Sequence, residues 1–199
     1  MNLPNKLTVL RIILTPIFML TLVWSFPFHY AVSLLIFIAA SITDLLDGKI
    51  ARKRGLVTDF GKFLDPLADK MLTTAAFLGF IALDIGYGAV WIAFIVLFRE
   101  FAVSSVRLIA STSGGKVIAA NIWGKLKTVS QMIAIIFALT AKQSFEILSM
   151  LGINVEILSA IELILGVATS VLLWVSAILC IISGVIYIID NKEFISQTK

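Results

Sequence analysis

The chain carries little charge for its length, and this scarcity excludes the soluble classes of protein. Only 14% of its 199 residues are Asp, Glu, Lys or Arg, whereas 60% are hydrophobic. The mean hydropathy is correspondingly high, at +1.05. A soluble domain of this size has too little interior to hide so much apolar surface. The composition therefore predicts an all-α integral membrane protein.

Cysteine, repeats and linkers are also scarce or missing. Cys180 is the only cysteine, so an intrachain disulfide is excluded, and we interpret it as a buried or lipid-facing thiol. Without a repeat, low-complexity tract or linker to divide the chain, residues 1–199 are expected to form a single membrane domain. The pI of about 9.3 is typical of contact with anionic lipid headgroups. No soluble basic domain is present to bind nucleic acid.

Six apolar stretches are long enough to cross roughly 30 Å of hydrocarbon. They cover residues 8–27, 30–50, 62–83, 88–110, 128–150 and 158–189. The fifth is the weakest, because Lys142, Gln143 and Glu146 interrupt its second half. The sixth exceeds one crossing, which predicts tilt or an extension beyond the bilayer. Residues 1–11 could begin as a short interfacial helix.

Lysine and arginine lie almost entirely on one side of these predicted spans. With the N-terminus inside, the inner side collects nearly all of them, and the outer side keeps Lys142. This asymmetry places both termini and the polar loops 51–61 and 111–127 in the cytoplasm. His29 falls in an outer loop, where we interpret it as neither ligand nor base.

Four aspartates stand out within residues 44–69 of this apolar chain. Together with their spaced partners they read Asp44-x2-Asp47-Gly48-x2-Ala51-Arg52-x8-Gly61-x3-Asp65-x3-Asp69. In a helix over 41–52 the first five fixed positions share one face, and in a helix over 61–80 the last three do so. Each helix then presents a pair of carboxylates. Because ionisable groups inside a membrane are costly, this arrangement predicts a cytoplasm-facing metal site.

This pattern resembles the signature of the CDP-alcohol phosphotransferases, and every fixed position of that signature is met. Members of the family are six-span membrane enzymes with a cytoplasmic site. Attack on a pyrophosphate must overcome repulsion between anions, which hard divalent cations held by carboxylates relieve. The predicted ligands of two Mg²⁺ or Mn²⁺ ions are Asp44, Asp47, Asp65 and Asp69. The resemblance also implies that Asp69 is the general base for the acceptor hydroxyl.

The remaining signature positions are candidates for binding the CDP-lipid. Gly48 and Ala51 are small enough for the nucleotide to lie against their helix, and Arg52 offers a planar fork to phosphate. Taken alone, Gly48, Ala51 and Gly61 would equally suit close packing of helices. Further candidates, carried over from the resemblance, are Gly61, Thr58 and Asn5.

Segments outside the signature resemble the phosphatidylglycerophosphate synthase branch of the family. They are residues 4–11, 99–107 and 124–132. The implied reaction joins CDP-diacylglycerol to sn-glycerol 3-phosphate, giving phosphatidylglycerophosphate and CMP in a bacterial cytoplasmic membrane. The acceptor phosphate needs its own cations, and we expect these to be Arg107, Lys125 and Arg99. Arg99 could instead form a structural pair with Glu100, and Lys127 is interpreted as an interfacial anchor.

Two alternatives remain open at this point. A sister enzyme could use inositol phosphate, serine or phosphatidylglycerol as its acceptor. A divalent-cation transporter would also place carboxylates within the membrane, but it leaves Arg52 and the small residues unexplained. The family resemblance further implies a homodimer.

Overall fold

A computed structural model describes residues 2–54, 59–112 and 122–191, with the side chains at 45–54, 59–63, 65, 66, 69 and 108–112 left aside. This described part consists of helices joined by short turns and contains no strand. Its helices are α1 (Leu3–Val23), α2 (His29–Arg54), α3 (Asp59–Ala82), α4 (Ala89–Thr112), α5 (Ile122–Met150) and α6 (Val155–Asp190). Each predicted apolar stretch thus lies within or largely within one helix. Residues 3–11, predicted to begin as an interfacial helix, are helical and continue without a break into the rest of α1.

Local signals account for several of these helix ends. Asn2 accepts a hydrogen bond from the backbone N–H of Asn5 at 3.2 Å, and Pro4 occupies the first turn of α1. Asn154 caps α6 in the same way, through the backbone N–H of Glu156 at 2.9 Å. Gly152, with φ of +68°, makes the turn between α5 and α6 in a conformation that favours glycine.

The length and apolar character of the described helices can be compared with what a membrane crossing requires. Among the described residues, four helical stretches are long and apolar enough to cross one: α1, residues 89–107 of α4, α5 and α6. The apolar parts of α2 and α3 within the described residues are shorter, at His29–Asp44 and Lys70–Ala82. The 36 residues of α6 correspond to about 54 Å at 1.5 Å per residue, well beyond one crossing.

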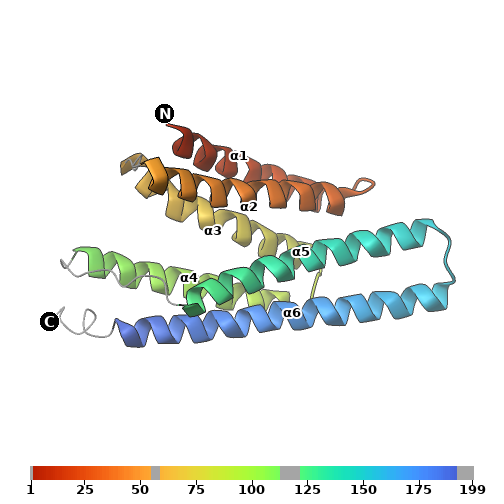
Figure 1. The fold of residues 1–199 in the computed structure, drawn as a ribbon. Coiled ribbons are helices and arrows are strands. Elements are labelled where there is room, and N and C mark those ends of the chain that lie inside the picture. The colour runs from red at the N-terminus through yellow and green to blue at the C-terminus, as the bar shows by residue number, and fades with distance from the viewer. Residues whose placement is uncertain (1, 55–58, 113–121, 192–199) are drawn as a thin grey trace.

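The helices form an up-and-down bundle in which consecutive helices run in opposite directions (Figure 1). α1 packs against α2 and α3, α5 packs against α2 and α6, and α4 packs against α3 and α6. Phe18, Phe37, Phe80, Leu139 and Leu173 lie in the shared core, which also buries the Cys180 thiol. The beginning of α1 and the end of α6 lie at one end of the bundle, and the α5–α6 connection projects beyond the other helices at the opposite end.

The polar interruption predicted in the fifth span has a structural purpose. Gln143 Oε1 accepts a hydrogen bond from the backbone N–H of Ala31 at 2.7 Å, and Glu146 Oε1 accepts one from Phe28 at 3.1 Å. Gln143 Nε2 also donates to Glu146 Oε2 at 3.0 Å. These two side chains of α5 therefore satisfy the unpaired amide groups at the start of α2. His29, at that start, is buried with Nδ1 3.1 Å from the Leu22 carbonyl oxygen.

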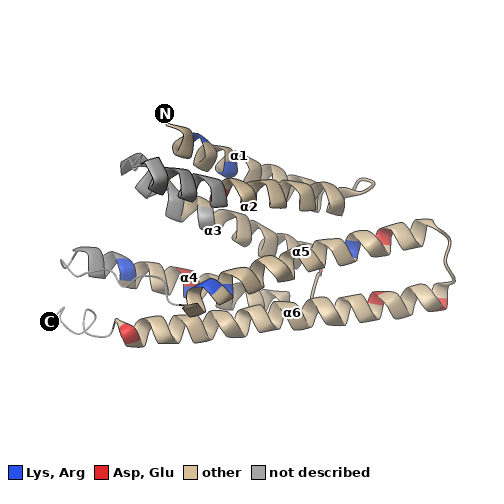
Figure 2. Cartoon of the chain, viewed as in Figure 1, with Lys and Arg blue, Asp and Glu red and all other residues tan. Residues whose placement is uncertain are grey.

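Charge is distributed unevenly along the bundle (Figure 2). Lys and Arg gather toward the end where α1 begins, in the first turns of α1, the last turns of α4 and the start of α5. The opposite end, around the α5–α6 connection, carries Glu146, Glu156 and Glu162 with Lys142.

Candidate functional site

The signature residues lie on α2 and α3, and the two predicted helical segments are confirmed. Residues 41–52 are helical within α2 and residues 61–80 are helical within α3. The first five fixed positions therefore share one face of α2, and the last three share one face of α3. Among these eight residues, Asp44 is the one whose side chain is described. The other seven side chains, and Thr58 with its backbone, lie outside the described residues.

Asp44 is held by an arginine from α1. Arg11 Nη1 lies 2.7 Å from Asp44 Oδ1, the Arg11 side chain is 2% exposed, and the Asp44 side chain is 47% exposed. A charged hydrogen bond of this kind orients a carboxylate, as outer partners of metal ligands commonly do. Asn5, a predicted CDP-lipid-binding residue, and Thr8 are buried on the same helix as Arg11.

The carboxylate of Asp44 is a suitable ligand for the predicted metal site. Its half-exposed side chain has a second carboxylate oxygen beyond the one paired to Arg11, and hard divalent cations prefer oxygen ligands. Within the described side chains no group of three or more His, Cys, Asp or Glu converges. The remaining three predicted ligands are outside that set, so the metal site stays a prediction.

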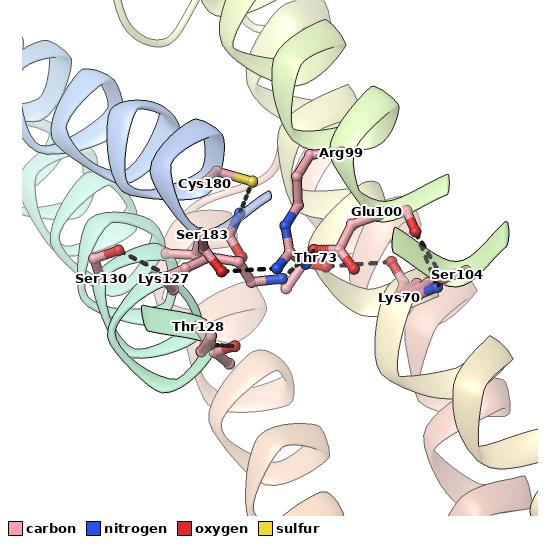
Figure 3. Close-up of polar contacts among 12 residues, drawn as sticks. Lys70, Thr73, Arg99, Glu100, Ser104, Lys127, Thr128, Ser130, Cys180 and Ser183 are labelled. Atoms are coloured by element: carbon pink, nitrogen blue, oxygen red, sulfur yellow. Dashed lines mark hydrogen bonds and ion pairs between the residues drawn. The ribbon is translucent and has the colours of Figure 1, made fainter. Parts of the chain in front are cut away.

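A cluster of cations surrounds Glu100 in the interior, and we call Lys70, Arg99, Glu100 and Lys127 the Glu100 cluster (Figure 3). Lys127 Nζ pairs with Glu100 Oε1, and Arg99 Nη1 lies 3.3 Å from the same oxygen. Lys70 Nζ donates to Ser104 Oγ and lies 3.4 Å from the Glu100 carbonyl oxygen. One carboxylate therefore faces several cations, which favours binding of an anion.

α6 forms one wall of this cluster. Arg99 Nη2 donates to Ser183 Oγ at 2.8 Å. The next residue, Gly184, gives the arginine stem its space, because a Cβ there would lie 2.8 Å from Arg99 Cγ. Neither α6 residue was among the predicted site residues. The sequence signal was faint: a serine and a glycine in a long apolar run.

The predicted acceptor-site residues occupy different environments. Arg99 is nearly buried in the Glu100 cluster, its side chain 11% exposed. Arg107 is exposed, and its guanidinium lies 6.0 Å from the centre of the Tyr187 ring. Lys125 is exposed. The interpretation of Lys127 as an interfacial anchor was wrong, because this lysine is 8% exposed and paired with Glu100.

Lys70 is the cation that sequence reasoning assigned no part in the site. It directly follows Asp69 in α3, so the two Cα atoms are about 3.8 Å apart. One member of the Glu100 cluster is therefore the chain neighbour of the last position of the signature. The spacing along α3 could have suggested this, but Lys70 finds its partners only on α4.

These features define a helical membrane protein in which three cations gather around Glu100 and two helices carry the signature aspartates. The profile of the CDP-alcohol phosphatidyltransferase family matches residues 1–189. The chain belongs to this family.

Curated relatives carry more specific names. The CDP-diacylglycerol–glycerol-3-phosphate 3-phosphatidyltransferase of Bacillus subtilis is 38% identical over 210 residues, covering 100% of this chain and 99% of its own. The protein of the same name from Rickettsia bellii is 34% identical, with 97% of each chain covered. A probable phosphatidylglycerophosphate synthase of Mycobacterium tuberculosis is 42% identical over 67% of this chain and 64% of its own.

Proposed function

We propose that this protein transfers a phosphatidyl group from CDP-diacylglycerol to sn-glycerol 3-phosphate and releases CMP. The observation that carries the proposal is the Glu100 cluster, whose member Lys70 directly follows Asp69, in a chain of the CDP-alcohol phosphatidyltransferase family. An acceptor that carries its own phosphate requires such cations in addition to those that serve the pyrophosphate. The names of the Bacillus and Rickettsia relatives support this acceptor.

In the proposed reaction the acceptor hydroxyl oxygen forms a bond to the phosphorus of the phosphatidyl group. The bond from that phosphorus to the oxygen of CMP breaks, and CMP leaves with the bonding electrons. The hydroxyl proton passes to the carboxylate of Asp69, the proposed general base. The electrons and the proton thus balance without any other reactant.

Two sets of residues are assigned to the CDP-lipid end of the site. Mg²⁺ or Mn²⁺, when bound, neutralises charge on the pyrophosphate, and its proposed ligands are Asp44, Asp47, Asp65 and Asp69. Arg11 would hold Asp44 in place by the ion pair already described. The cytidine nucleotide and its phosphates are assigned to Asn5, Gly48, Ala51, Arg52, Thr58 and Gly61.

The acceptor phosphate is assigned to cations of α4 and α5. Arg107 and Lys125, both exposed, would meet the incoming phosphate, and Arg99 would form the deeper side of the site. We add Lys127 and Lys70 to this set, because both belong to the Glu100 cluster. The sequence suggested two roles for Arg99, as a structural partner of Glu100 and as a ligand of the acceptor phosphate. Arg99 can have both roles, because its side chain pairs with Glu100 and faces the proposed site.

The proposed setting is a bacterial cytoplasmic membrane that the chain crosses six times, with the site facing the cytoplasm. The concentration of Lys and Arg at the end where α1 begins supports this orientation. The assembly proposed is a homodimer, by resemblance to the family.

The test is incorporation of radiolabelled glycerol 3-phosphate into lipid by the purified protein with CDP-diacylglycerol and Mg²⁺. We expect incorporation with matching CMP release, and its loss when a chelator is added. Asp69→Asn should lower turnover by about 10²- to 10⁴-fold, the usual contribution of a general base. Asp84→Asn, at the opposite end of the bundle in the α3–α4 connection, is the matched control and should keep full activity.

Three outcomes would contradict the proposal. CMP release with inositol phosphate or serine, but not with glycerol 3-phosphate, would assign another acceptor. Full turnover by Asp69→Asn would remove that residue as the base. Binding of divalent ions without CMP release for any alcohol would favour a transporter.

A further inference from the structure

The cytoplasmic part of α6, by the proposed orientation, carries polar residues on a single helical face. Ser183, Tyr187 and Asn191 fall at i, i+4 and i+8, and they are 3%, 6% and 1% exposed. The intervening residues are mostly apolar, and Val185, Ile188 and Ile189 are exposed to the surroundings. Burying a polar face on such an apolar helix costs free energy unless its polar groups form hydrogen bonds.

Some of these buried polar groups have no partner. Tyr187 Oη, Asn191 Oδ1 and Arg99 Nε are buried, and none makes a hydrogen bond within the described part of the chain. Leaving a buried polar group unsatisfied costs about 1–3 kcal/mol, and most such groups in native proteins are paired. Arg99 donates to Ser183, one turn before Tyr187, so these orphaned atoms line one stretch of α6.

The charges around this stretch indicate what could satisfy them. The Arg107 guanidinium lies over the Tyr187 ring, and Arg99 connects the stretch to the Glu100 cluster. Cations of this kind bind a phosphate. Asn191 Oδ1 differs, because it can only accept a hydrogen bond, and a phosphate dianion has none to donate. A ligand that meets all of these groups therefore carries both a phosphate and a hydroxyl.

Asn191 is oriented for this purpose by its own amide. Its Nδ2 donates to the Tyr187 carbonyl oxygen at 2.8 Å, which leaves Oδ1 as the remaining polar atom of the side chain. A hydroxyl group can donate to Asn191 Oδ1 while it accepts a hydrogen bond from Tyr187 Oη. A ligand hydroxyl therefore has the donor that Asn191 Oδ1 lacks and the acceptor that Tyr187 Oη lacks.

We propose that Tyr187 and Asn191 bind the non-reacting hydroxyl of a small polyol phosphate acceptor. The inference rests on the proposed function. In sn-glycerol 3-phosphate the primary hydroxyl attacks phosphorus, and the secondary hydroxyl is left to be recognised. Tyr187 and Asn191 are thus specificity residues, which read the acceptor backbone while Arg107, Arg99 and Lys127 hold its phosphate.

The experiment compares glycerol 3-phosphate with 3-hydroxypropyl phosphate, which keeps the primary hydroxyl and the phosphate but lacks the secondary hydroxyl. Initial rates are measured for the wild type, Tyr187→Phe and Asn191→Ala. For Tyr187→Phe we expect the KM for glycerol 3-phosphate to rise about tenfold, the effect of one lost hydrogen bond to a ligand. Its KM for CDP-diacylglycerol should stay within about twofold of the wild-type value.

The deoxy analogue and a melting measurement separate recognition from a structural effect. With 3-hydroxypropyl phosphate, wild type and Tyr187→Phe should have the same KM, because the hydroxyl they would distinguish is gone. The Tm of the ligand-free variant should be unchanged or higher, since the deleted hydroxyl has no described protein partner. Asn191→Ala should show the same loss of discrimination between the two acceptors. Tyr87→Phe, exposed in the α3–α4 connection, is the matched control and should behave as wild type.

Several results would overturn the proposal. An unchanged KM for glycerol 3-phosphate in both α6 variants would mean that the acceptor does not contact Tyr187 Oη or Asn191 Oδ1, and that only water bonds to these atoms. An equal rise in the KM of Tyr187→Phe for both acceptors would mean that Tyr187 contacts the phosphate instead of the secondary hydroxyl. A lowered Tm for Tyr187→Phe with unchanged KM would give the hydroxyl a structural role. If the wild type itself fails to use glycerol 3-phosphate, the proposed function fails first, and the variants then report nothing on the acceptor.

Discussion

Glu100 is the one carboxylate in the Glu100 cluster, and replacing it by glutamine tests whether that cluster is held together by charge. Glutamine keeps the size of the side chain and one acceptor oxygen, but it removes the negative charge that faces Lys127 and Arg99. The side chains of Glu100, Lys127 and Arg99 are 16%, 9% and 11% exposed, so water screens the remaining cations poorly.

The magnitude follows from the contacts. Removing one partner of a buried ion pair costs about 3–5 kcal/mol. Here the cost is smaller, because Arg99 keeps Ser183 and the glutamine oxygen can still accept a hydrogen bond. We expect Glu100→Gln to lose about 2–3 kcal/mol, which for a chain of this length lowers the Tm by about 5–10 °C.

Thermal unfolding of the purified protein in detergent, followed by circular dichroism, measures this effect. Inorganic phosphate should raise the Tm of Glu100→Gln more than that of the wild type, because an added anion replaces the lost carboxylate. Glu162→Gln, on an exposed position of α6 at the opposite end, removes the same charge and should leave the Tm unchanged. An unchanged Tm for Glu100→Gln, or a phosphate effect equal to that of wild type, would refute the electrostatic account.

Three further predictions concern neighbouring contacts. Gly184→Ala should raise the KM for glycerol 3-phosphate about tenfold in initial-rate assays, since its Cβ would lie 2.8 Å from Arg99 Cγ; an unchanged KM would mean that Arg99 does not bind the acceptor. Glu146→Ala should cost about 1–2 kcal/mol in thermal unfolding, because it removes an acceptor from the start of α2, and an equal Tm would show that the cap is dispensable. Arg11→Gln should raise the Mg²⁺ concentration needed for half-maximal CMP release about tenfold, since Asp44 loses its ion pair, and an unchanged Mg²⁺ requirement would argue against Asp44 as a metal ligand.

The proposal on α6 and the prediction for Glu100 concern the same region but predict different effects on acceptor affinity and on stability. Tyr187→Phe removes a group with no described protein partner, so it should change acceptor affinity without loss of stability. Glu100→Gln removes a group with two cationic partners, so stability should fall. Measuring Tm and KM for both variants therefore separates recognition from electrostatic support.

The helical segments and the family signature could be predicted from the sequence. Apolar stretches of membrane length and the spacing of Asp44, Asp47, Asp65 and Asp69 are local properties of the chain, and helical periodicity converts them directly into faces. The predicted ends differ from the observed helices by several residues in places. The fifth helix begins at Ile122 rather than residue 128, because the amphipathic turns before that residue are also helical.

Which polar residues meet could not be predicted in this way. Lys125 and Lys127 are two residues apart, and nothing in the sequence distinguishes the exposed lysine from the one paired with Glu100. Gln143 and Glu146 weakened the prediction of the fifth span, yet they bind backbone groups at the start of α2, more than 110 residues earlier. In each case the partner lies on another helix.

The sequence by itself determined the secondary structure, the membrane class and the family, because these depend on hydrophobicity and on spacing within single helices. Only the tertiary structure decided that Lys70, Glu100, Lys127 and Ser183 meet, and that Tyr187 lies under Arg107. The physical reason is that burial and charge pairing depend on how helices rotate and pack against one another. That packing is set by side chains far apart in the chain, which local periodicity does not connect.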